Sequence, residues 1–492
     1  MPAVAGLAPE VLAKYEPVIG LEVHVQLLTR TKAFCGCENR FGAEPNTNIC
    51  PVCLGLPGSL PVLNAKAVEF ATLASLALHC EVRPRSIFAR KNYFYPDLPK
   101  GYQISQYDKP LAEHGWIEVP TAAGATKKIG ITRVHMEEDA GKSLHDGFPD
   151  SATRTYLDLN RCGTPLIEIV SEPDIRTPDE AFEYLTRLKE ILLYTAVSDC
   201  NMEEGSLRCD ANVSVRPRGQ EKLGTKAEVK NVNSFKFIRA ALEYEIERQI
   251  EVIESGGKVA QETRLYNADE GRTYSMRSKE QAHDYRYFPE PDLPPLIVTP
   301  EFLSETRKKL PELPEARRAR MISEYDLNEQ DARTLTASRD FADRFETAAK
   351  AAKNPRRVAN VLLSEVGGRL KALGLEQENS PVSMAGIVLA ADLLDEGKIS
   401  SKQMKQLLDI CFEKGEDFPT VYEREKPQQI TDSVAIEKLI DEVIASNPKQ
   451  VEQYRAGKKT VAGFFVGQVM RASKGQANPA LLNELVMKKL EG

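Results

Sequence analysis

The sequence predicts an α+β fold in which a first domain built on a mixed sheet is followed by an all-α helical domain and a small all-α tail domain. The chain has 492 residues, more than one hydrophobic core usually organises, so several domains are expected. Alternating apolar and polar segments occur up to about residue 299, whereas residues 301–415 show no sustained alternation and are rich in Ala, Leu, Arg and Glu. Prolines crowd between these two regions, and a charged stretch containing proline precedes the tail. We therefore expect domains at residues 1–298, 299–420 and 421–492.

Two helices are expected within the first domain, and capping residues mark their ends. Thr177 is in position to cap the first helix, with Pro178 in its first turn and Glu180 completing a capping box. The second helix covers about residues 235–255, where a pair of glycines ends it.

The tail is predicted to be helical and is positively charged. Residues 436–444 carry an apolar stripe at helical spacing, and Pro479 begins a last helix. From residue 449 onward there are eight basic and three acidic residues, a net charge of plus 5 that leaves minus 12 on the first 448 residues. The loop with Lys458 and Lys459 could contact phosphates, although a basic run is also typical of a solvated helix face.

The composition limits the class of protein. A net charge of minus 7 excludes a uniformly basic surface for nucleic acid, so any such contact must be local. There is no run of about 18 apolar residues, and the first 17 residues lack the features of a secretory signal. We expect a cytoplasmic protein with no membrane segment, or one of an organelle matrix in a eukaryote, although no transit peptide is seen. Nine cysteines, odd in number and partly clustered, indicate thiols in a reducing compartment.

One predicted strand carries groups that can bind a cation. Residues 18–27 alternate with period two, so Glu22, His24 and Gln26 share one face of the strand. A carboxylate and an imidazole on one face form ligand geometry for a divalent cation, although a polar strand edge facing solvent would give the same pattern.

Other predicted strands contribute acids. Glu168 stands inside an otherwise apolar strand, Glu138 lies near the end of the strand-like run 131–139, Asp210 alternates within 207–216, and Glu228 follows. Buried carboxylates require a metal, a cation or a set of hydrogen bonds. A Mg²⁺–phosphate site built across a sheet requires several strands that each offer one acid. For each segment taken alone, a polar strand face exposed to solvent would explain the pattern as well.

Four cysteines form a candidate zinc site. Cys35-x-Cys37 and Cys50-x-x-Cys53 stand within 19 residues, among glycine and proline turns. We expect a structural Cys₄ zinc knuckle because four protein ligands close the coordination shell; packed free thiols are the alternative.

Known phosphate-binding motifs are missing from the sequence. Gly141-Lys142-Ser143 lacks the upstream glycine of a Walker A loop, and no GxGxxG occurs, so ATP would need another architecture. Residues 91–103 are crowded with aromatics and prolines, and they could stack an unpaired base, line a substrate pocket or form a packed loop.

Taken together, these residues resemble the B subunit of the tRNA-dependent Asp/Glu amidotransferases. The likeness covers about residue 15 to the C-terminus. The matching blocks are residues 18–25, 41–46, 51–57, 91–106, 135–142, 163–168, 202–212 and 228–234.

The resemblance implies a cradle-shaped catalytic domain, a helical domain and a tail that touches tRNA. It implies that ATP and Mg²⁺ serve to phosphorylate the side-chain carboxylate of Glu misacylated onto tRNA(Gln), or of Asp on tRNA(Asn). Ammonia then displaces the phosphate after passing through a tunnel from a glutaminase A subunit, and a small C subunit ties the two subunits together.

The resemblance also assigns roles to residues. Glu22, His24, Glu138, Glu168, Asp210 and Glu228 match the acids and the histidine around Mg²⁺ and the phosphoryl group, with His24, Glu138 and Glu168 expected nearest the metal. Lys91 matches a position on the tunnel wall. The four cysteines match zinc-bearing members of the family, which implies structural Zn²⁺. Contacts between the tail and tRNA are expected at Lys458, Lys459, Arg471 and Lys474.

Two other functions stay open on the residues alone. A zinc-stabilised RNA-binding assembly factor without catalysis would explain the cysteines and the basic tail, but not several acids on inward-facing strands. An ATP-dependent ligase that acts on a free amino acid would not need the basic tail.

Overall fold

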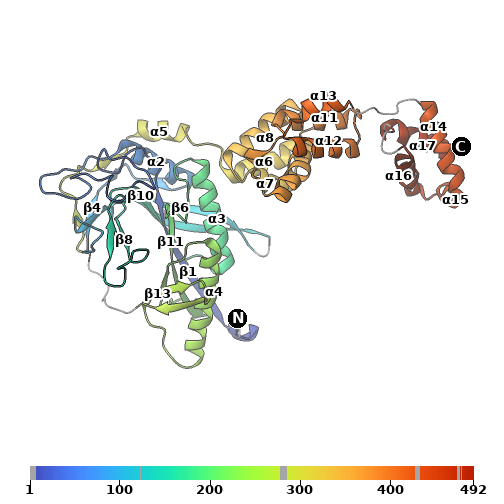
Figure 1. Cartoon of the computed structure of the whole chain (residues 1–492). Helices are drawn as coiled ribbons and strands as arrows, with labels where there is room; N and C mark the ends of the chain where they lie inside the picture. Colours follow the sequence, from blue (N-terminus) through green and yellow to red (C-terminus); the bar gives the residue numbers. More distant parts are fainter. Residues whose placement is uncertain are drawn as a thin grey trace. The chain divides into compact units, whose positions relative to one another are not determined.

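The protein divides into two compact units, residues 1–313 and 314–492. The computed structural model describes residues 7–121, 124–276, 285–426, 433–473, 477 and 479–491, and Figure 1 traces the chain. The first unit combines sheets with helices and the second is helical, which confirms the predicted α+β class. Among the described residues, no helix has the length and apolar character needed to span a bilayer.

A large mixed sheet organises the first unit. Its strand order is β14-β13-β12-β11-β1-β10-β7-β6-β2, with antiparallel neighbours except for the parallel pair β12 and β13. The strands are β1 (Tyr15–Gln26), β2 (Glu81–Val82), β6 (Ala112–Pro120), β7 (Thr126–Glu138), β10 (Pro165–Ser171), β11 (Leu207–Pro217), β12 (Ala227–Lys230), β13 (Glu262–Asn267) and β14 (Arg272–Ser275).

The central strand β1 separates an apolar face from a polar face. Its alternation buries Leu21, Val23 and Val25 almost completely, and they belong to the hydrophobic core of this unit. Helices α3 (Pro178–Tyr194) and α4 (Phe235–Glu254) lie side by side along the sheet and contribute Leu188 and Leu242 to that core (Figure 1). The polar side chains of β1 are thereby left for the opposite face.

The two helices begin and end close to the predicted residues. The Thr177 side chain accepts a hydrogen bond from the Glu180 backbone N–H, as expected of an N-cap. The predicted capping box is not completed, because the Glu180 carboxylate instead accepts from the Arg176 N–H and from Lys127. Helix α4 ends at Glu254, and Gly256 follows it with a left-handed φ of 77°.

A small sheet connects the aromatic region to the large sheet. Its order is β15 (Phe288–Pro289), β4 (Ala89–Asn92) and β5 (Tyr102–Ser105). Lys91 lies opposite Gln103 and Ala89 opposite Ser105, so these four side chains share one face. The remaining elements of this unit are α1 (Pro9–Leu12), α2 (Ala65–Ala77), the ribbons β3 (Arg85–Ser86) with β16 (Leu296–Ile297) and β8 (Lys142–Leu144) with β9 (Tyr156–Asp158), and α5 (Pro300–Lys308).

The described residues of the helical unit form two separate hydrophobic cores. The first core is formed by α6 (Pro314–Tyr325), α7 (Glu329–Leu335), α8 (Arg339–Ala351), α9 (Pro355–Asn360), a π-helical turn (Val361–Val366), α10 (Gly367–Leu373), a 3₁₀ turn (Gln377–Asn379), α11 (Met384–Asp395), α12 (Ser401–Lys414) and α13 (Phe418–Glu425). Phe418 and Val421 are buried in it, so this core continues past residue 420. The second core is formed by α14 (Ser433–Ser446), α15 (Pro448–Arg455), a 3₁₀ turn (Lys459–Val461), α16 (Ala462–Ala472) and α17 (Pro479–Glu491).

Candidate active site

Strand pairing brings the polar residues of β1 together with polar residues of its neighbours. His24 lies opposite Glu168 of β10 and opposite Arg208 of β11, and Glu168 lies opposite His135 of β7. Directly opposed residues share a face of a sheet. Four adjacent strands therefore present His135, Glu168, His24 and Arg208 in one row.

Five polar side chains on this face form what we call the carboxylate–histidine cluster: Glu22, His24, His135, Glu137 and Glu168. His24 Nε2 lies 3.3 Å from Glu168 Oε2 and 3.8 Å from Glu22 Oε1. His135 Nε2 lies 3.5 Å from the same Glu168 oxygen and 3.2 Å from Glu137 Oε1. Glu168 is thus shared between two sets, one with Glu22 and His24 and one with His135 and Glu137.

The two glutamates nearest His24 have opposite pKa shifts. Burial, together with the charge of Glu168, raises the pKa of Glu22 above its ordinary value. Burial also opposes ionisation of Glu168, but His135 and the hydrogen bond with His24 overcome it and lower its pKa. Burial lowers the pKa of His24, but the hydrogen bond and charge of Glu168, together with the charge of Glu137, raise it overall. Carboxylates whose pKa values are pushed apart in this way occur at catalytic and binding sites.

The cluster has the donor atoms and spacing of a divalent cation site. In each of its two sets, the ligand atoms lie within 4.8 Å of one another. Ligands of an octahedral Mg²⁺ ion are separated by about 3 to 4 Å, so small side-chain rotations would suffice. Carboxylate oxygens are the ligands that Mg²⁺ prefers, and Glu22, His24 and Glu168 fit such an ion.

Lys91 reaches the cluster from the small sheet. Its Nζ lies 3.7 Å from Glu137 Oε1, while Ser105 and Gln103 from the same face of the small sheet donate hydrogen bonds to the Glu137 carboxylate. Burial lowers the pKa of Lys91, but Glu137 together with Tyr287, Glu168 and Tyr285 raises it overall, so the lysine stays charged. Burial would raise the pKa of Glu137, whereas Lys91 and His135 lower it well below its usual range. The small sheet therefore fixes one ammonium group beside the carboxylates.

Asp210 and Glu228 share a lysine beside the cluster. Lys230 Nζ donates to Asp210 Oδ2 at 2.9 Å and lies 3.2 Å from Glu228 Oε1. Burial lowers the pKa of Lys230, but Asp210 and then Glu228 raise it by more. Glu228 also accepts from the Thr263 hydroxyl at 2.8 Å. Asp210 lies opposite Glu22 across the strand pair, so these groups continue the polar face outward from the cluster.

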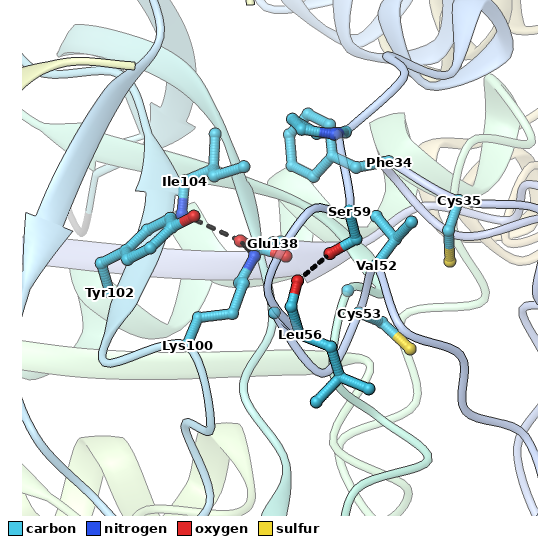
Figure 2. A pocket seen from close by; sticks show the side chains of 13 residues that line it. Phe34, Cys35, Val52, Cys53, Leu56, Ser59, Lys100, Tyr102, Ile104 and Glu138 are labelled. Atoms are coloured by element: carbon cyan, nitrogen blue, oxygen red, sulfur yellow. Dashed lines mark hydrogen bonds and ion pairs between the residues drawn. The ribbon is translucent and has the colours of Figure 1, made fainter. Parts of the chain in front are cut away.

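Glu138 is not brought into the cluster, in contrast to the expectation from sequence. Successive residues of β7 point to opposite faces, so Glu137 turns toward Glu168 and Glu138 turns away. The Glu138 carboxylate instead pairs with Lys100 Nζ and accepts from the Ile104 N–H at 3.0 Å. These groups line a cavity of about 130 Å³ that is also lined by Cys35 and Cys53. Figure 2 shows the side chains around it.

The four predicted zinc ligands converge. The sulfur atoms of Cys35, Cys37, Cys50 and Cys53 lie within 4.8 Å of one another, close to the spacing of about 3.8 Å in a tetrahedral Zn²⁺–thiolate site. A hydrogen bond from Cys35 lowers the pKa of the Cys53 thiol to about 5. The buried Lys32 places its Nζ 3.9 Å from Cys53 Sγ and 2.8 Å from the Asn48 carbonyl, where its charge would offset that of a thiolate cluster. These residues fit a structural zinc ion.

The sequence interpretation missed two members of the cluster, His135 and Glu137. Both are buried and lie two residues apart on β7, and the alternation of residues 131–139 could have indicated that they share a face. A second polar group was also missed: buried Asp139 accepts hydrogen bonds from Gln26 at 2.7 Å and from Arg208 at 2.8 Å. It closes the end of the polar face next to His24.

The basic residues expected to contact tRNA are exposed where the structure describes them. Lys458, Lys459 and Arg471 are all exposed, and Lys459 Nζ lies 4.2 Å from the centre of the Tyr454 ring. Lys474 lies outside the described residues.

Two family profiles match the chain. The family described as "GatB/GatE catalytic domain" matches residues 17–304, which contain the cluster, the small sheet and the four cysteines. The family described as "GatB domain" matches residues 343–490, within the helical unit.

Curated relatives align over nearly the full length. The chain is 55% identical over 478 residues to a protein of Geobacter sulfurreducens, with 97% of this chain and 100% of the relative covered. It is 53% identical over 479 residues to a protein of Persephonella marina, with 97% and 100% covered. A protein of Carboxydothermus hydrogenoformans is 54% identical over 479 residues, with 97% and 99% covered. Each of these relatives is named as the B subunit of an aspartyl/glutamyl-tRNA(Asn/Gln) amidotransferase.

Proposed function

Because the chain belongs to the GatB/GatE family and to the B subunits of the aspartyl/glutamyl-tRNA(Asn/Gln) amidotransferases, we propose that it forms side-chain amides on misacylated tRNA. Its substrates would be Glu-tRNA(Gln), Asp-tRNA(Asn) or both. In the proposed reaction, ATP phosphorylates the side-chain carboxylate, and ammonia then displaces the phosphate to leave the amide.

The observation that carries this proposal is the carboxylate–histidine cluster with Lys91 at its edge. A carboxylate is a poor electrophile because its oxygen is a poor leaving group, so it must be activated before an amine can replace that oxygen. Transfer of a phosphoryl group to it requires positive charge and positioned ligands around the phosphates. The cluster supplies ligands through Glu22, His24 and Glu168, whereas Lys91 and Lys230 supply positive charge on either side of them.

We place Mg²⁺ on Glu22, His24 and Glu168, with Glu138 outside this set. When bound, the ion would neutralise the phosphate oxygens during transfer. Glu137 and His135 hold Glu168 and Lys91 in position through their contacts. Asp210 and Glu228 lie one and two strands beyond β1, and we assign them to ATP, a second ion or the substrate carboxylate.

The second step depends on excluding water, because an acyl phosphate hydrolyses readily. Ammonia must therefore arrive directly, and we assign Lys91 to the wall of its path, as the family resemblance suggests. The source would be a glutaminase A subunit held by a small C subunit. The sequence contains no GxSxG nucleophile motif, in keeping with a subunit that receives its ammonia from a partner.

The zinc knuckle and the tail complete the proposal. Cys35, Cys37, Cys50 and Cys53 would hold a structural Zn²⁺ ion next to the cavity that contains Glu138. Lys458, Lys459, Arg471 and Lys474 would contact tRNA phosphates. A cytoplasmic location, where misacylated tRNA is made, belongs to the same proposal.

The test is amide formation by the assembled enzyme. The chain, co-expressed with its A and C subunits, would be incubated with ATP, glutamine and each misacylated tRNA, and the amino acid released from the tRNA would be identified. We expect Gln from Glu-tRNA(Gln), Asn from Asp-tRNA(Asn), or both. Release of unchanged Glu and Asp from both tRNAs would contradict the proposal and leave the RNA-binding assembly factor as the alternative.

A further inference from the structure

A group of five tyrosines lies at the edge of the carboxylate–histidine cluster, with Tyr93, Tyr285 and Tyr287 nearest to Lys91. They come from three places in the sequence that the small sheet brings together. Tyr93 and Tyr95 follow β4, Tyr107 follows β5, and Tyr285 and Tyr287 precede β15. We call this group the tyrosine platform.

The rings of the platform form a continuous series of contacts. Tyr107 stacks on Tyr287 with centroids 4.2 Å apart and planes at 8°. Tyr287 meets Tyr285 edge to face at 6.0 Å, and Tyr285 meets Tyr93 in the same way at 6.0 Å. Lys91 Nζ lies 5.2 Å from the centre of the Tyr285 ring. The series therefore leads from the molecular surface to the lysine that touches Glu137.

The two ends of the series differ in what holds them. Tyr93 is fixed inside the site, because its hydroxyl donates to Gln103, which in turn donates to Glu137. Burial raises the pKa of Tyr287 to about 12, and the charges of Lys91, Glu137 and Glu168 also act on it. Tyr107 is 59% exposed although one face of its ring is covered by Tyr287. An exposed ring held parallel to a second ring offers a flat surface on which a further planar group can stack.

The aromatic rings distinguish this side of the cluster from the other. In strand order, β11 and β12 with Arg208 and Lys230 lie on one side of β1, whereas β7, over which the small sheet packs, lies on the other. Both sides carry cations that already contact acids: Lys230 contacts Asp210 and Arg208 contacts Asp139 on the first side, whereas Lys91 contacts Glu137 and Arg133 contacts Glu168 on the platform side. What the platform side adds is its series of aromatic rings. An unpaired nucleoside, which binds through stacking of its base, matches that side.

We propose that the Tyr107–Tyr287 stack binds the adenine ring of the terminal nucleotide of the aminoacylated tRNA, so that the attached amino acid points along Lys91 into the cluster. This inference rests on the proposed function, because it names the binding place of that substrate's end. Stacking on tyrosine is independent of the amino acid carried, so the same platform serves Glu-tRNA and Asp-tRNA.

A double-mutant cycle between the protein and the RNA tests this proposal without requiring turnover. Affinities of the assembled enzyme would be measured for intact tRNA and for tRNA that lacks its terminal adenosine. The variants are Tyr107→Leu, Tyr107→Phe and, as a matched control, Tyr274→Leu, an exposed tyrosine of β14 outside the platform. We expect removal of the adenosine to weaken binding to the unmodified enzyme about 10-fold, and Tyr107→Leu to weaken binding of intact tRNA about 10-fold. Tyr107→Leu should cause no further loss of affinity when the tRNA already lacks its terminal adenosine. Tyr107→Phe keeps the ring and should retain the affinity for intact tRNA, whereas the control Tyr274→Leu should behave as the unmodified enzyme.

Three outcomes would overturn the proposal. In the first, Tyr107→Leu leaves the affinity for intact tRNA unchanged, or the combined change weakens binding by the product of the two separate losses. In the second, Tyr107→Leu raises KM for ATP instead, which would assign the ring to the adenine of ATP. In the third, Tyr107→Leu prevents co-purification of the A and C subunits, which would make the platform a protein interface. Failure of the amidation reaction in the unmodified enzyme would contradict the proposed function, whereas the binding cycle would still report on the platform.

Discussion

Replacing Glu137 by Gln tests whether the buried charges of the cluster depend on one another. The Glu137 side chain is 2% exposed and carries hydrogen bonds or ion pairs with Ser105, Gln103, His135 and Lys91. The amide has nearly the same shape but no charge. The substitution would leave Lys91, whose side chain is 19% exposed, without the acid it contacts. The NH₂ group of the new glutamine would also face Ser105 and Gln103, which now donate hydrogen bonds to Glu137.

The expected loss of stability is large. Removing one partner of a buried pair costs about 3 to 5 kcal/mol, and the partial exposure of Lys91 favours the lower value, about 3 kcal/mol. Because the folded state lowers the pKa of Glu137, its stabilising effect is present above the unfolded pKa of about 4.3 and is lost as the pH falls through the folded value. The difference from the unmodified protein should therefore be constant above about pH 5.5.

Urea unfolding followed by tryptophan fluorescence measures this loss. Trp116 is the only tryptophan of the chain, lies on β6 of the same sheet and stacks on His79 with centroids 3.8 Å apart, so it reports on the first unit. Glu113→Gln is the control, since it breaks the more exposed pair with Arg83 and should cost about 1 kcal/mol or less. Adding Lys91→Met to Glu137→Gln should recover part of the loss. If Glu137→Gln destabilises no more than Glu113→Gln, the argument that these charges hold one another in place is refuted.

Three further predictions concern other parts of the protein. Lys32→Met should weaken zinc binding about 10- to 100-fold while one zinc per chain still binds at saturation, as measured by competition with a chelator; unchanged affinity would contradict the contact with Cys53. Asp139→Asn should lower the free energy of unfolding at neutral pH, because Arg208, Arg161 and Gln26 overcome the effect of burial and lower the pKa of Asp139 in the folded state. The difference in stability between the variant and the unmodified protein should shrink below about pH 4. A difference that stays constant down to about pH 2 would refute this account. Ending the chain after Lys426 should abolish most tRNA affinity while ATP turnover is kept. Ending it after residue 417 should also unfold the first helical core, because Phe418 and Val421 are buried in that core. Equal stability of the two truncated chains would contradict the extension of this core past residue 420.

Much of the site could be predicted from local sequence patterns. The alternation of residues 18–27 placed Glu22 and His24 on one face, and strand β1 has that alternation. The capping residue Thr177 fixed the start of α3. The spacing of the four cysteines predicted their convergence. These features depend on residues close together in the chain, where backbone geometry alone decides which side chains meet.

What the sequence could not supply was set by contacts between distant residues. Glu137 and Glu138 are adjacent and equally buried, and only the pairing of His135 with Glu168 decides which carboxylate enters the cluster. Lys91 reaches Glu137 because β4 pairs with β5, whose Gln103 and Ser105 bond to Glu137 of the large sheet. Likewise, the extension of the first helical core beyond residue 420 follows from the packing of α13 and not from the charged composition of that stretch.

The most direct test of the central claim follows one oxygen atom through the reaction. The side-chain carboxylate of the misacylated Glu or Asp would be labelled with oxygen-18, and the inorganic phosphate formed by the assembled enzyme with ATP and glutamine would be analysed by mass spectrometry. If the carboxylate is phosphorylated at the cluster and ammonia then displaces the phosphate, each amide formed leaves one labelled oxygen in phosphate. Amide formation with unlabelled phosphate would show that ATP hydrolysis does not activate the carboxylate, and it would contradict the account.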